Sequence, residues 1–231
     1  MSIYLLALET SSTNCSVAIS KDGVIIGSKE INDNKYSHSE NLHLFIQDLL
    51  IALNVSVNDL SAIVLGKGPG SYTGLRIGTA TAKGLSFSLQ IPLISVCSLK
   101  ALALEGFSSY NEKKSLENFF IVPMADARRM EVYTAIVTPL GAYHTPPTNL
   151  VLTSDSYLEL LNTHTLLFVG DGASKFQKIC SHPNALFLSD EVYYPSAMKC
   201  LDLAWDKFLK EDFEDLAYFE PFYLKKFKTN F

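Results

Sequence analysis

The order of predicted strands and helices repeats once along the chain, and this repetition is the strongest constraint on its fold. The first half is predicted to contain three strands, a helix, a strand and a helix, over 3–9, 15–20, 24–30, 38–53, 62–66 and 73–89. The second half repeats that order over 119–125, 131–138, 143–152, a helix ending near 162, 166–170 and 173–181. Meandering strands followed by strand–helix units build a mixed sheet covered by helices. The sequence therefore predicts an α/β chain with two βββαβα lobes.

Two such lobes facing each other form the actin-like (ASKHA, ribonuclease H-like) architecture, which is the fold we expect. Short strands at 93–97 and 186–188 and a helix over 196–210 complete the two copies. Between the copies, Gly106, Ser108 and Ser109 interrupt the pattern. We therefore place an N-terminal lobe at 1–105 and a C-terminal lobe at 106–231.

Two helix starts carry capping signals. Ser37 is a predicted N-cap, and Glu40 lies three residues later, where a capping-box partner belongs. In the second lobe, Ser154 or Asp155 is predicted to cap the helix that ends near residue 162.

Charge and composition exclude several classes of protein. With 48% hydrophobic residues, the chain is a folded protein rather than a disordered one. Its net charge is −5, and the one basic cluster is Lys225, Lys226 and Lys228, so tRNA binding by this chain alone is not expected. The apolar run at 3–8 is too short for a signal peptide, and no stretch has the length of a membrane span. The four cysteines form no C-x-x-C pair. These features predict a cytoplasmic protein with reduced thiols and no membrane contact.

The glycine-rich stretch from Gly66 to Gly78 joins a predicted strand to a predicted helix. Backbone N–H groups at a helix start are a natural anion site. The stretch lacks the order of Lys and Ser/Thr that closes a P-loop. The alternative is a tight strand-to-helix connection whose glycines serve close packing, which the helix that follows favours, and the sequence leaves both interpretations open.

The first hairpin loop of each lobe is expected to face the cleft between them. Thr10, Ser11 and Ser12 in the first loop, with Asp126 and Arg128 in the second, are possible ligands for an anion. The first loop contains no glycine, which phosphate hairpins normally use for close approach of the backbone. Polar turns that satisfy their own backbone are the alternative for both loops.

Metal and nucleophilic centres find no support in the spacing of residues. His38 and His43 are five residues apart and fall on different sides of a helix, whereas a shared metal needs a spacing of three or four. No Ser/His/Asp or Cys/His set has supporting spacing. We expect no metal and no catalytic residue.

Two helices of the first lobe have apolar residues on a second face. On helix 38–53, Leu44 and Ile51 lie opposite the inward face, seven residues apart. On helix 73–89, Ile77, Ala80, Gly84 and Phe87 share a face distinct from that of Leu75 and Leu85. An ordinary surface helix has one apolar face. The sequence therefore predicts that a second helix layer packs here, supplied either by the other lobe or by another protein.

At these residues the sequence resembles the bacterial TsaB (YeaZ) family. The matching segments are Leu6–Ser11, His38–Glu40, Gly68–Gly78, Asp126–Arg128 with Glu131–Tyr133, Gly170–Ala173 and Glu220–Leu224. They span both lobes, and the long glycine-rich segment is the most specific of them.

The resemblance implies a non-catalytic relative of TsaD, in which Ser98 and Leu102 occupy the places of the two histidines of an H-x-x-x-H metal motif. A leucine cannot bind a metal, so ATP and a metal are expected on the TsaD partner and no cofactor on this chain alone. The implied function is to bind and support TsaD in threonylcarbamoylation of adenosine 37 of tRNAs reading ANN codons. The alternatives are a stand-alone actin-like ATPase or metallopeptidase and, with Asp126 as base, a kinase-like enzyme.

The family also implies how the chain meets its partners. TsaD would dock on helices 38–53 and 73–89, TsaE is a further partner, and the chain alone would form a homodimer through an overlapping surface. tRNA would be reached only through the complex. The expected partner-binding residues are His38, Asn41, Leu44, Asp48, Ile51, Arg76, Ile77, Ala80, Lys83, Gly84 and Phe87.

Overall fold

The computed structural model describes residues 2–32, 37–110, 117–188 and 193–225. The first half forms a five-stranded sheet in the order β3-β2-β1-β4-β5. Its strands are β1 (Tyr4–Glu9), β2 (Cys15–Lys21), β3 (Val24–Ile31), β4 (Leu60–Gly66) and β5 (Leu93–Val96). The first three strands are antiparallel, while β4 and β5 run parallel to β1.

The second half forms a sheet with the corresponding order β10-β9-β6-β7-β8. Its strands are β6 (Phe119–Asp126), β7 (Glu131–Val137), β8 (Tyr143–Val151), β9 (Thr165–Val169) and β10 (Ala185–Phe187). Again three antiparallel strands are followed by two parallel ones. The repeated topology confirms the prediction of two related lobes with the actin-like arrangement.

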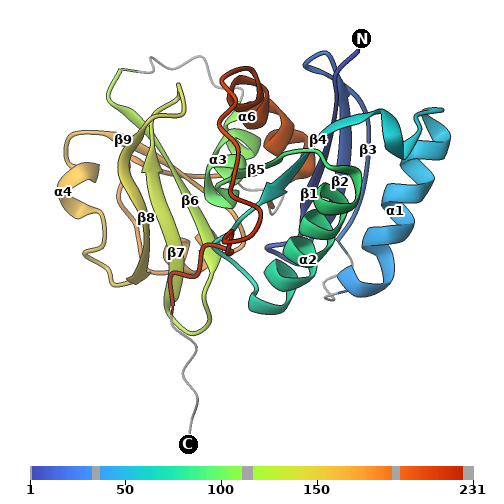
Figure 1. Cartoon of the computed structure of the whole chain (residues 1–231). Coiled ribbons are helices and arrows are strands. Elements are labelled where there is room, and N and C mark those ends of the chain that lie inside the picture. The colour runs from blue at the N-terminus through green and yellow to red at the C-terminus, as the bar shows by residue number, and fades with distance from the viewer. Residues whose placement is uncertain (1, 33–36, 111–116, 189–192, 226–231) are drawn as a thin grey trace, which may run out of the picture.

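The helices and sheets lie in five layers (Figure 1). Helices α1 (His38–Ala52) and α2 (Tyr72–Leu89) cover the outer face of the first sheet. Two further helices, α3 (Ser98–Ser108) and α6 (Ala197–Leu209), lie between the sheets. On the outer face of the second sheet lie α4 (Leu158–Leu161) and α5 (Ala173–Gln177).

Alternation along β1 gives the first sheet two buried faces. Leu6 and Leu8 pack with the side chains of α1 and α2, and Leu5 and Ala7 pack with those of α6. Successive side chains of a strand point to opposite faces, so an uninterrupted apolar run is what a sheet covered on both sides requires. The same run was the sequence signal for this strand.

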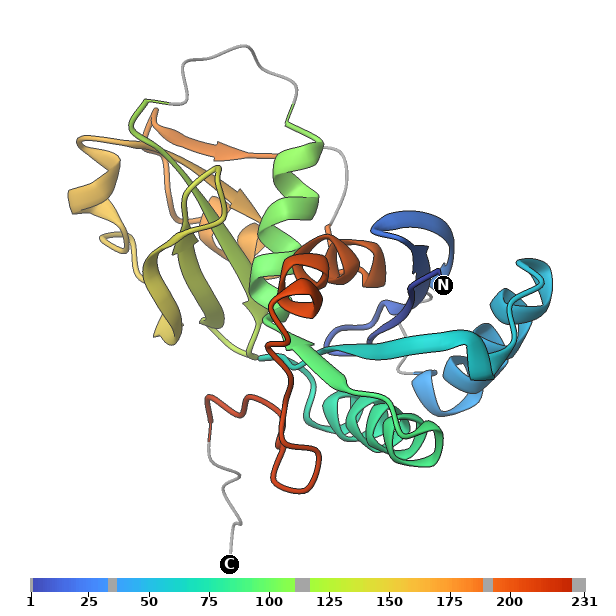
Figure 2. The ribbon, with the colours of Figure 1, turned by 45° about the horizontal axis from the view of Figure 1, so that its top comes forward.

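Each half of the chain supplies one helix to the core of the other half's sheet. Leu99, Leu102 and Ala103 of α3 join the core of the second sheet, while Cys200, Leu201 and Ala204 of α6 join that of the first. The helix α6 thereby returns the end of the chain to the first lobe, as Figure 2 shows. The expected division between 105 and 106 falls inside α3.

Two local predictions were wrong, and a third was correct only in position. The helix α3 was not predicted, because Gly106 and Ser108 were interpreted as a break. Ser37 stands at the N-cap of α1, but its side chain makes no capping hydrogen bond to the helix backbone; its Oγ accepts instead from Asn41 Nδ2 at 2.9 Å. The helix expected to end near 162 is the short α4, which starts after Tyr157 because Ser154 and Asp155 lie in a turn.

A segment over 210–225 follows α6 and crosses back along the first lobe (Figure 2). Glu214 N donates to the carbonyl of Leu93, and Phe222 N donates to that of Lys67, both at 2.8 Å. Phe219 is buried in the core beneath α2. The C-terminal segment is thus fixed to the first lobe. In the part of the chain that the structure describes, no helix is both long enough and apolar enough to span a membrane.

Candidate functional site

The outer face of α1 carries apolar side chains that the core does not use. Leu42, Phe45 and Leu49 face the first sheet and are buried. On the opposite side, Leu44 is 55% exposed and Ile51 is 70% exposed. Asp48 lies between them and pairs with Lys29 of β3. The helix thus has an inward face that holds it to the sheet and a second apolar stripe that faces solvent.

The outer face of α2 lies beside that of α1 (Figure 1) and combines small residues with one large aromatic. Ala80 and Gly84 are exposed one turn apart. A Cβ built on Gly84 would meet nothing within 4 Å, so the space above it is open. Phe87, at the end of this stripe, is 70% exposed. Small residues flanked by exposed apolar ones allow the backbone of another helix to approach closely.

Three of the expected partner-binding residues are engaged within the chain. His38 is fully buried, with its ring Nε2 2.8 Å from the carbonyl oxygen of Ser12, so its inclusion was wrong: at the start of α1 it faces the loop below and not solvent. Lys83 donates from Nζ to the carbonyls of Ala217 and Phe219, and so fixes the C-terminal segment. Ile77 packs against the core of the first lobe.

The remaining residues of the expected set are at the surface. Arg76 lies over the ring of Tyr72, with its guanidinium carbon 4.2 Å from the ring centre. Asn41 is half-buried through its bond to Ser37. The accessible part of the predicted surface, which we name the α1–α2 face, therefore consists of Asn41, Leu44, Asp48, Ile51, Arg76, Ala80, Gly84 and Phe87.

The glycine-rich connection packs against the first hairpin loop. A Cβ on Gly70 or Gly74 would overlap the carbonyl oxygens of Ser11 and Thr10 respectively. Ser71 N donates to the Ser11 carbonyl at 2.7 Å, and Thr10 Oγ1 donates to the Gly74 carbonyl at 2.8 Å. Of the two interpretations left open, the structure supports close packing. It also corrects the prediction for Thr10 and Ser11, which are buried and hold α2 instead of lining an open anion site.

The corresponding loop of the second lobe is an Asp-centred turn. Asp126 Oδ1 accepts from Arg128 N at 2.6 Å and from Lys175 Nζ at 2.7 Å. Asp126 N donates to Asp171 Oδ1, whose pKa is raised by burial, partly offset by this hydrogen bond. Ser12 Oγ accepts from Asn14 N at 3.1 Å, so Ser12 and Asp126 each make these hydrogen bonds within their own lobe. For Asp126 the structure supports the alternative, a polar turn that is hydrogen-bonded within its own lobe. The side chain of Arg128 is exposed.

Ser98 and Leu102, which the family resemblance places at two metal-binding histidines, both make contacts inside the chain. Ser98 Oγ donates to Glu9 Oε2 at 2.7 Å, and Leu102 is buried in the core of the second lobe. Cys200 lies 3.8 Å from the same carboxyl oxygen, and burial, together with the charge of Glu9, raises the pKa of its thiol. Among the described residues, no three His, Cys, Asp or Glu side chains are grouped as a metal site.

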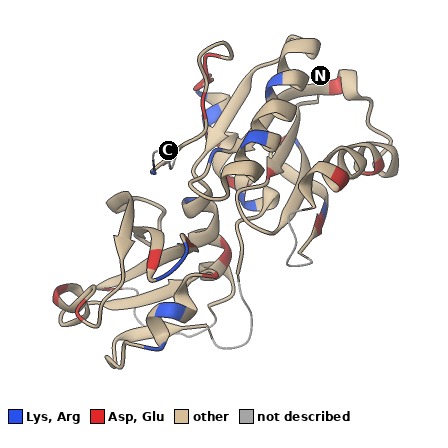
Figure 3. Ribbon diagram, turned by 90° about the horizontal axis from the view of Figure 1, so that it is seen from below, with Lys and Arg blue, Asp and Glu red and all other residues tan. Residues whose placement is uncertain are grey.

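Basic residues are interspersed with acidic ones on the face shown in Figure 3. Of the predicted basic cluster, Lys225 pairs with Glu131 and lies 5.9 Å from the ring centre of Tyr133. Lys226 and Lys228 lie outside the described residues. The described part of the cluster is therefore partly neutralised by its neighbours.

Comparisons with known proteins agree over most of the chain. Residues 31–229 match the family model described as TsaD, tRNA N6-adenosine threonylcarbamoyltransferase. The "tRNA threonylcarbamoyladenosine biosynthesis protein TsaB" of Escherichia coli is 28% identical over 225 residues, which cover 96% of this chain and 94% of that protein. Its Bacillus subtilis counterpart is 35% identical over 74% of this chain and 72% of that protein.

A solved structure extends the agreement to three dimensions. YeaZ from Pseudomonas aeruginosa superposes with a TM-score of 0.76 at 25% identity, covering 96% of this chain and 99% of that one. The sequence resemblance and the lobe topology point to the same group of proteins. The chain belongs to the TsaB (YeaZ) family.

Proposed function

We propose that this chain is a non-catalytic partner subunit that binds TsaD and supports it in threonylcarbamoylation of adenosine 37 of tRNAs reading ANN codons. The observation that carries this proposal is the α1–α2 face, where Leu44, Ile51 and Phe87 are exposed on neighbouring helices. The names of the curated relatives support a role in biosynthesis of threonylcarbamoyladenosine in tRNA.

The chemistry of the α1–α2 face suits a protein partner. Burying exposed leucine, isoleucine and phenylalanine side chains against a partner stabilises the complex by about 25 cal/mol per Å² of apolar surface removed from water. Arg76 and Asp48 add polar groups that can fix the orientation of a docked helix pair. The open space above Gly84 accommodates a side chain of the partner.

An accessory role is further supported by what fills the places where related enzymes hold ligands. Buried Thr10 and Ser11 pack on α2, and Ser98 and Leu102 are packed at the positions expected to correspond to the two metal-binding histidines. We propose that ATP and the metal act on TsaD. A stand-alone ATPase or metallopeptidase would need ligands that these four side chains do not offer.

The proposal extends to the assembly. TsaD would compete with a second copy of this chain for the α1–α2 face, since one surface cannot hold both. TsaE would be a further partner in the cytoplasm, and tRNA would be reached only through the complex. The negative net charge of the chain fits a subunit that leaves tRNA contact to its partner.

Leu44→Asp tests the docking surface. A carboxylate buried against an apolar partner stays desolvated without a counter-charge, so the affinity for TsaD from the same source should fall at least thirtyfold by calorimetry. Leu209→Asp is the matched control, because Leu209 is an exposed leucine on α6, remote in sequence from the α1–α2 face. It should bind TsaD normally.

Two outcomes would refute the proposal. The interface is elsewhere if Leu44→Asp and Leu209→Asp bind TsaD equally well. The accessory role fails if the isolated chain binds Mg-ATP at micromolar concentration and turns it over. Modification of tRNA by TsaD with and without the chain completes the test, and we expect none in its absence.

A further inference from the structure

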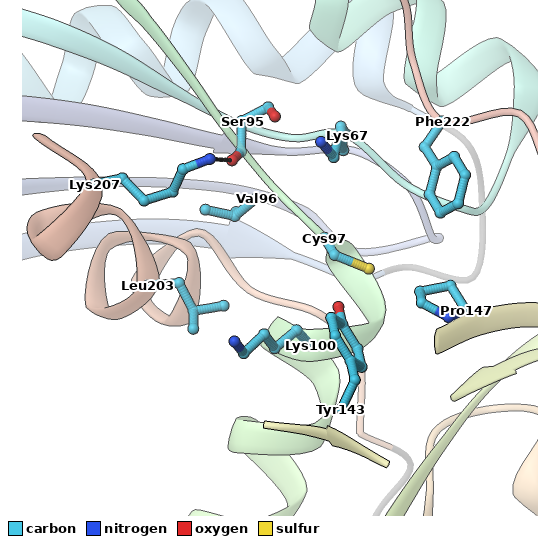
Figure 4. Close-up of a pocket in the computed structure, with 10 residues that line it drawn as sticks. All are labelled: Lys67, Ser95, Val96, Cys97, Lys100, Tyr143, Pro147, Leu203, Lys207 and Phe222. Atoms are coloured by element: carbon cyan, nitrogen blue, oxygen red, sulfur yellow. Dashed lines mark hydrogen bonds between the residues drawn. The ribbon is translucent and has the colours of Figure 1, made fainter. Parts of the chain in front are cut away.

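A pocket of about 430 Å³ lies at the junction of the two lobes, away from the α1–α2 face (Figure 4). Its wall includes the end of β5, the start of α3, one side of α6, the edge strand β8 and the C-terminal segment. Pockets of roughly 300–1,000 Å³ are the usual size for small-molecule sites. A molecule held here would touch both lobes and the crossing helices at once.

The lining of this pocket is cationic. Lys67, Lys100 and Lys207 contribute side chains from three separate parts of the chain, and none of the ten lining residues is Asp or Glu. The chain as a whole has a net charge of −5. Three ammonium groups gathered in one concave site of an acidic protein favour an anionic ligand.

The three lysines are not equivalent. Lys207 Nζ donates to the Ser95 carbonyl at 3.0 Å and pairs with Asp212 at 3.2 Å. Lys67 lies 3.9 Å from Glu214. Within the described ranges, no carboxylate lies at ion-pair distance from Lys100. Its charge is therefore the one in the pocket that lacks an acidic neighbour.

The aromatic ring of Tyr143 lies beside Lys100. The ammonium of Lys100 lies 5.5 Å from the centre of the Tyr143 ring. Burial, the nearby Cys97 thiol and a hydrogen bond between the two side chains raise the pKa of Tyr143, so its hydroxyl is neutral and adds no negative charge to the pocket. Figure 4 shows this hydroxyl directed toward Cys97, at the rim of the same space.

The rest of the lining is apolar. Phe222 and Pro147 stand on one side of the pocket, and Val96 and Leu203 lie on the other (Figure 4). An inorganic ion would leave these surfaces without a partner. A ligand with a flat apolar body and one anionic group would satisfy both kinds of wall.

We propose that this pocket binds a small organic anion, a carboxylate or phosphate ester of a ring compound. Its anionic group lies at Lys100, and its ring packs against Phe222. The α1–α2 face shares no residue with the pocket, so the inference stands independently of the proposed function.

Calorimetry on the full chain tests the proposal with four probes. Phenyl phosphate and phenylacetate each combine a ring with a charge, inorganic phosphate has the charge alone, and phenol has the ring alone. We expect at least one ring-bearing anion to bind at least tenfold more tightly than phosphate or phenol. Which of the two binds better identifies the anionic group as phosphate or carboxylate.

Lys100→Met should weaken that binding about tenfold, because a charge-assisted hydrogen bond is lost while the apolar stem is kept. Lys178→Met, which removes an exposed lysine just after α5, is the matched control. Phe222→Ala should weaken the binding of the ring-bearing anion and leave the weak binding of phosphate unchanged. Circular dichroism establishes that each variant is folded.

The proposal is overturned if neither ring-bearing anion binds better than its fragments. It is overturned equally if Lys100→Met and Lys178→Met change the affinity by the same factor, because the charge would then act from a distance and not within the pocket.

Discussion

The two lobes share one sheet topology but differ in what covers it. The outer face of the first sheet is covered by α1 and α2, of 15 and 18 residues, and that of the second by α4 and α5, of four and five. A long helix has enough surface to pack on its sheet and still present a second face. A helix of one turn has only enough to cover the core. The proposed docking surface therefore follows from the length of α1 and α2 and not from the sheets.

The second lobe compensates for its short helices with aromatic side chains. Phe176 of α5 is completely buried and contacts Tyr157, Phe168 and Phe187. Buried aromatics remove large apolar areas from water and prefer the tilted and edge-on geometries seen here. Phe176 alone thus provides much of the apolar contact between α5 and its sheet, whereas α1 makes its contact through several leucines.

The largest effect is expected for Phe176→Ala. It should lower the free energy of unfolding by about 3–5 kcal/mol, because the cavity left under α5 has no second large side chain from that helix to fill it. Urea unfolding measures this change. Ile179→Ala, at a partly exposed site just beyond α5, should cost much less. Equal losses would mean that α5 is not anchored in the way we describe.

The next effect separates the two faces of α2. Gly74→Ala should destabilise the chain by about 3 kcal/mol, because its Cβ would overlap the Thr10 carbonyl. Gly84→Ala should instead stabilise by about 0.5–1 kcal/mol, since alanine favours the helix and the space is open. A glycine-to-alanine substitution at these two positions therefore reports on the two opposite faces of α2. Urea unfolding measures both changes in stability. A loss of stability at Gly84 would contradict an open outer face.

The smallest effect concerns the aromatic cluster at high pH. Burial raises the pKa of Tyr157 to about 12, although its bond to Thr134 opposes this. The unfolded chain loses the proton near pH 10, so the folded state binds more protons above that pH and stability falls between about pH 10 and 12. Tyr157→Phe should flatten this decline in unfolding experiments. An unchanged slope would place the ionising group elsewhere.

Much of the fold could be predicted because apolar runs and turn residues are local signals. The strands and the helices α1 and α2 follow from them. The helix α3 was missed because Gly106 was interpreted as a breaker, although a Cβ there would overlap Val169 of β9. The requirement for glycine comes from a strand distant in the sequence, and no local pattern reveals it.

The candidate site was predictable in its helical positions and not in its contacts. Spacing alone identified Leu44, Ile51 and Phe87 as outward-facing. It could not show that the ring of His38 turns toward Ser12, or that Lys83 holds the C-terminal segment, since both depend on tertiary partners. The lysine pocket was missed for the same reason: its walls come from segments more than 100 residues apart in the chain.

The return of α6 to the first lobe sets the order in which the chain can mature. Until Cys200 and Leu201 have been synthesised, the inner face of the first sheet, with Leu5 and Val64, lacks the helix that shields it from water. The first lobe is therefore the first to be synthesised, but its core is complete only when α6, which follows the whole second sheet in the sequence, has been added. Detachment of α6 would expose the apolar inner face of the first sheet to water again.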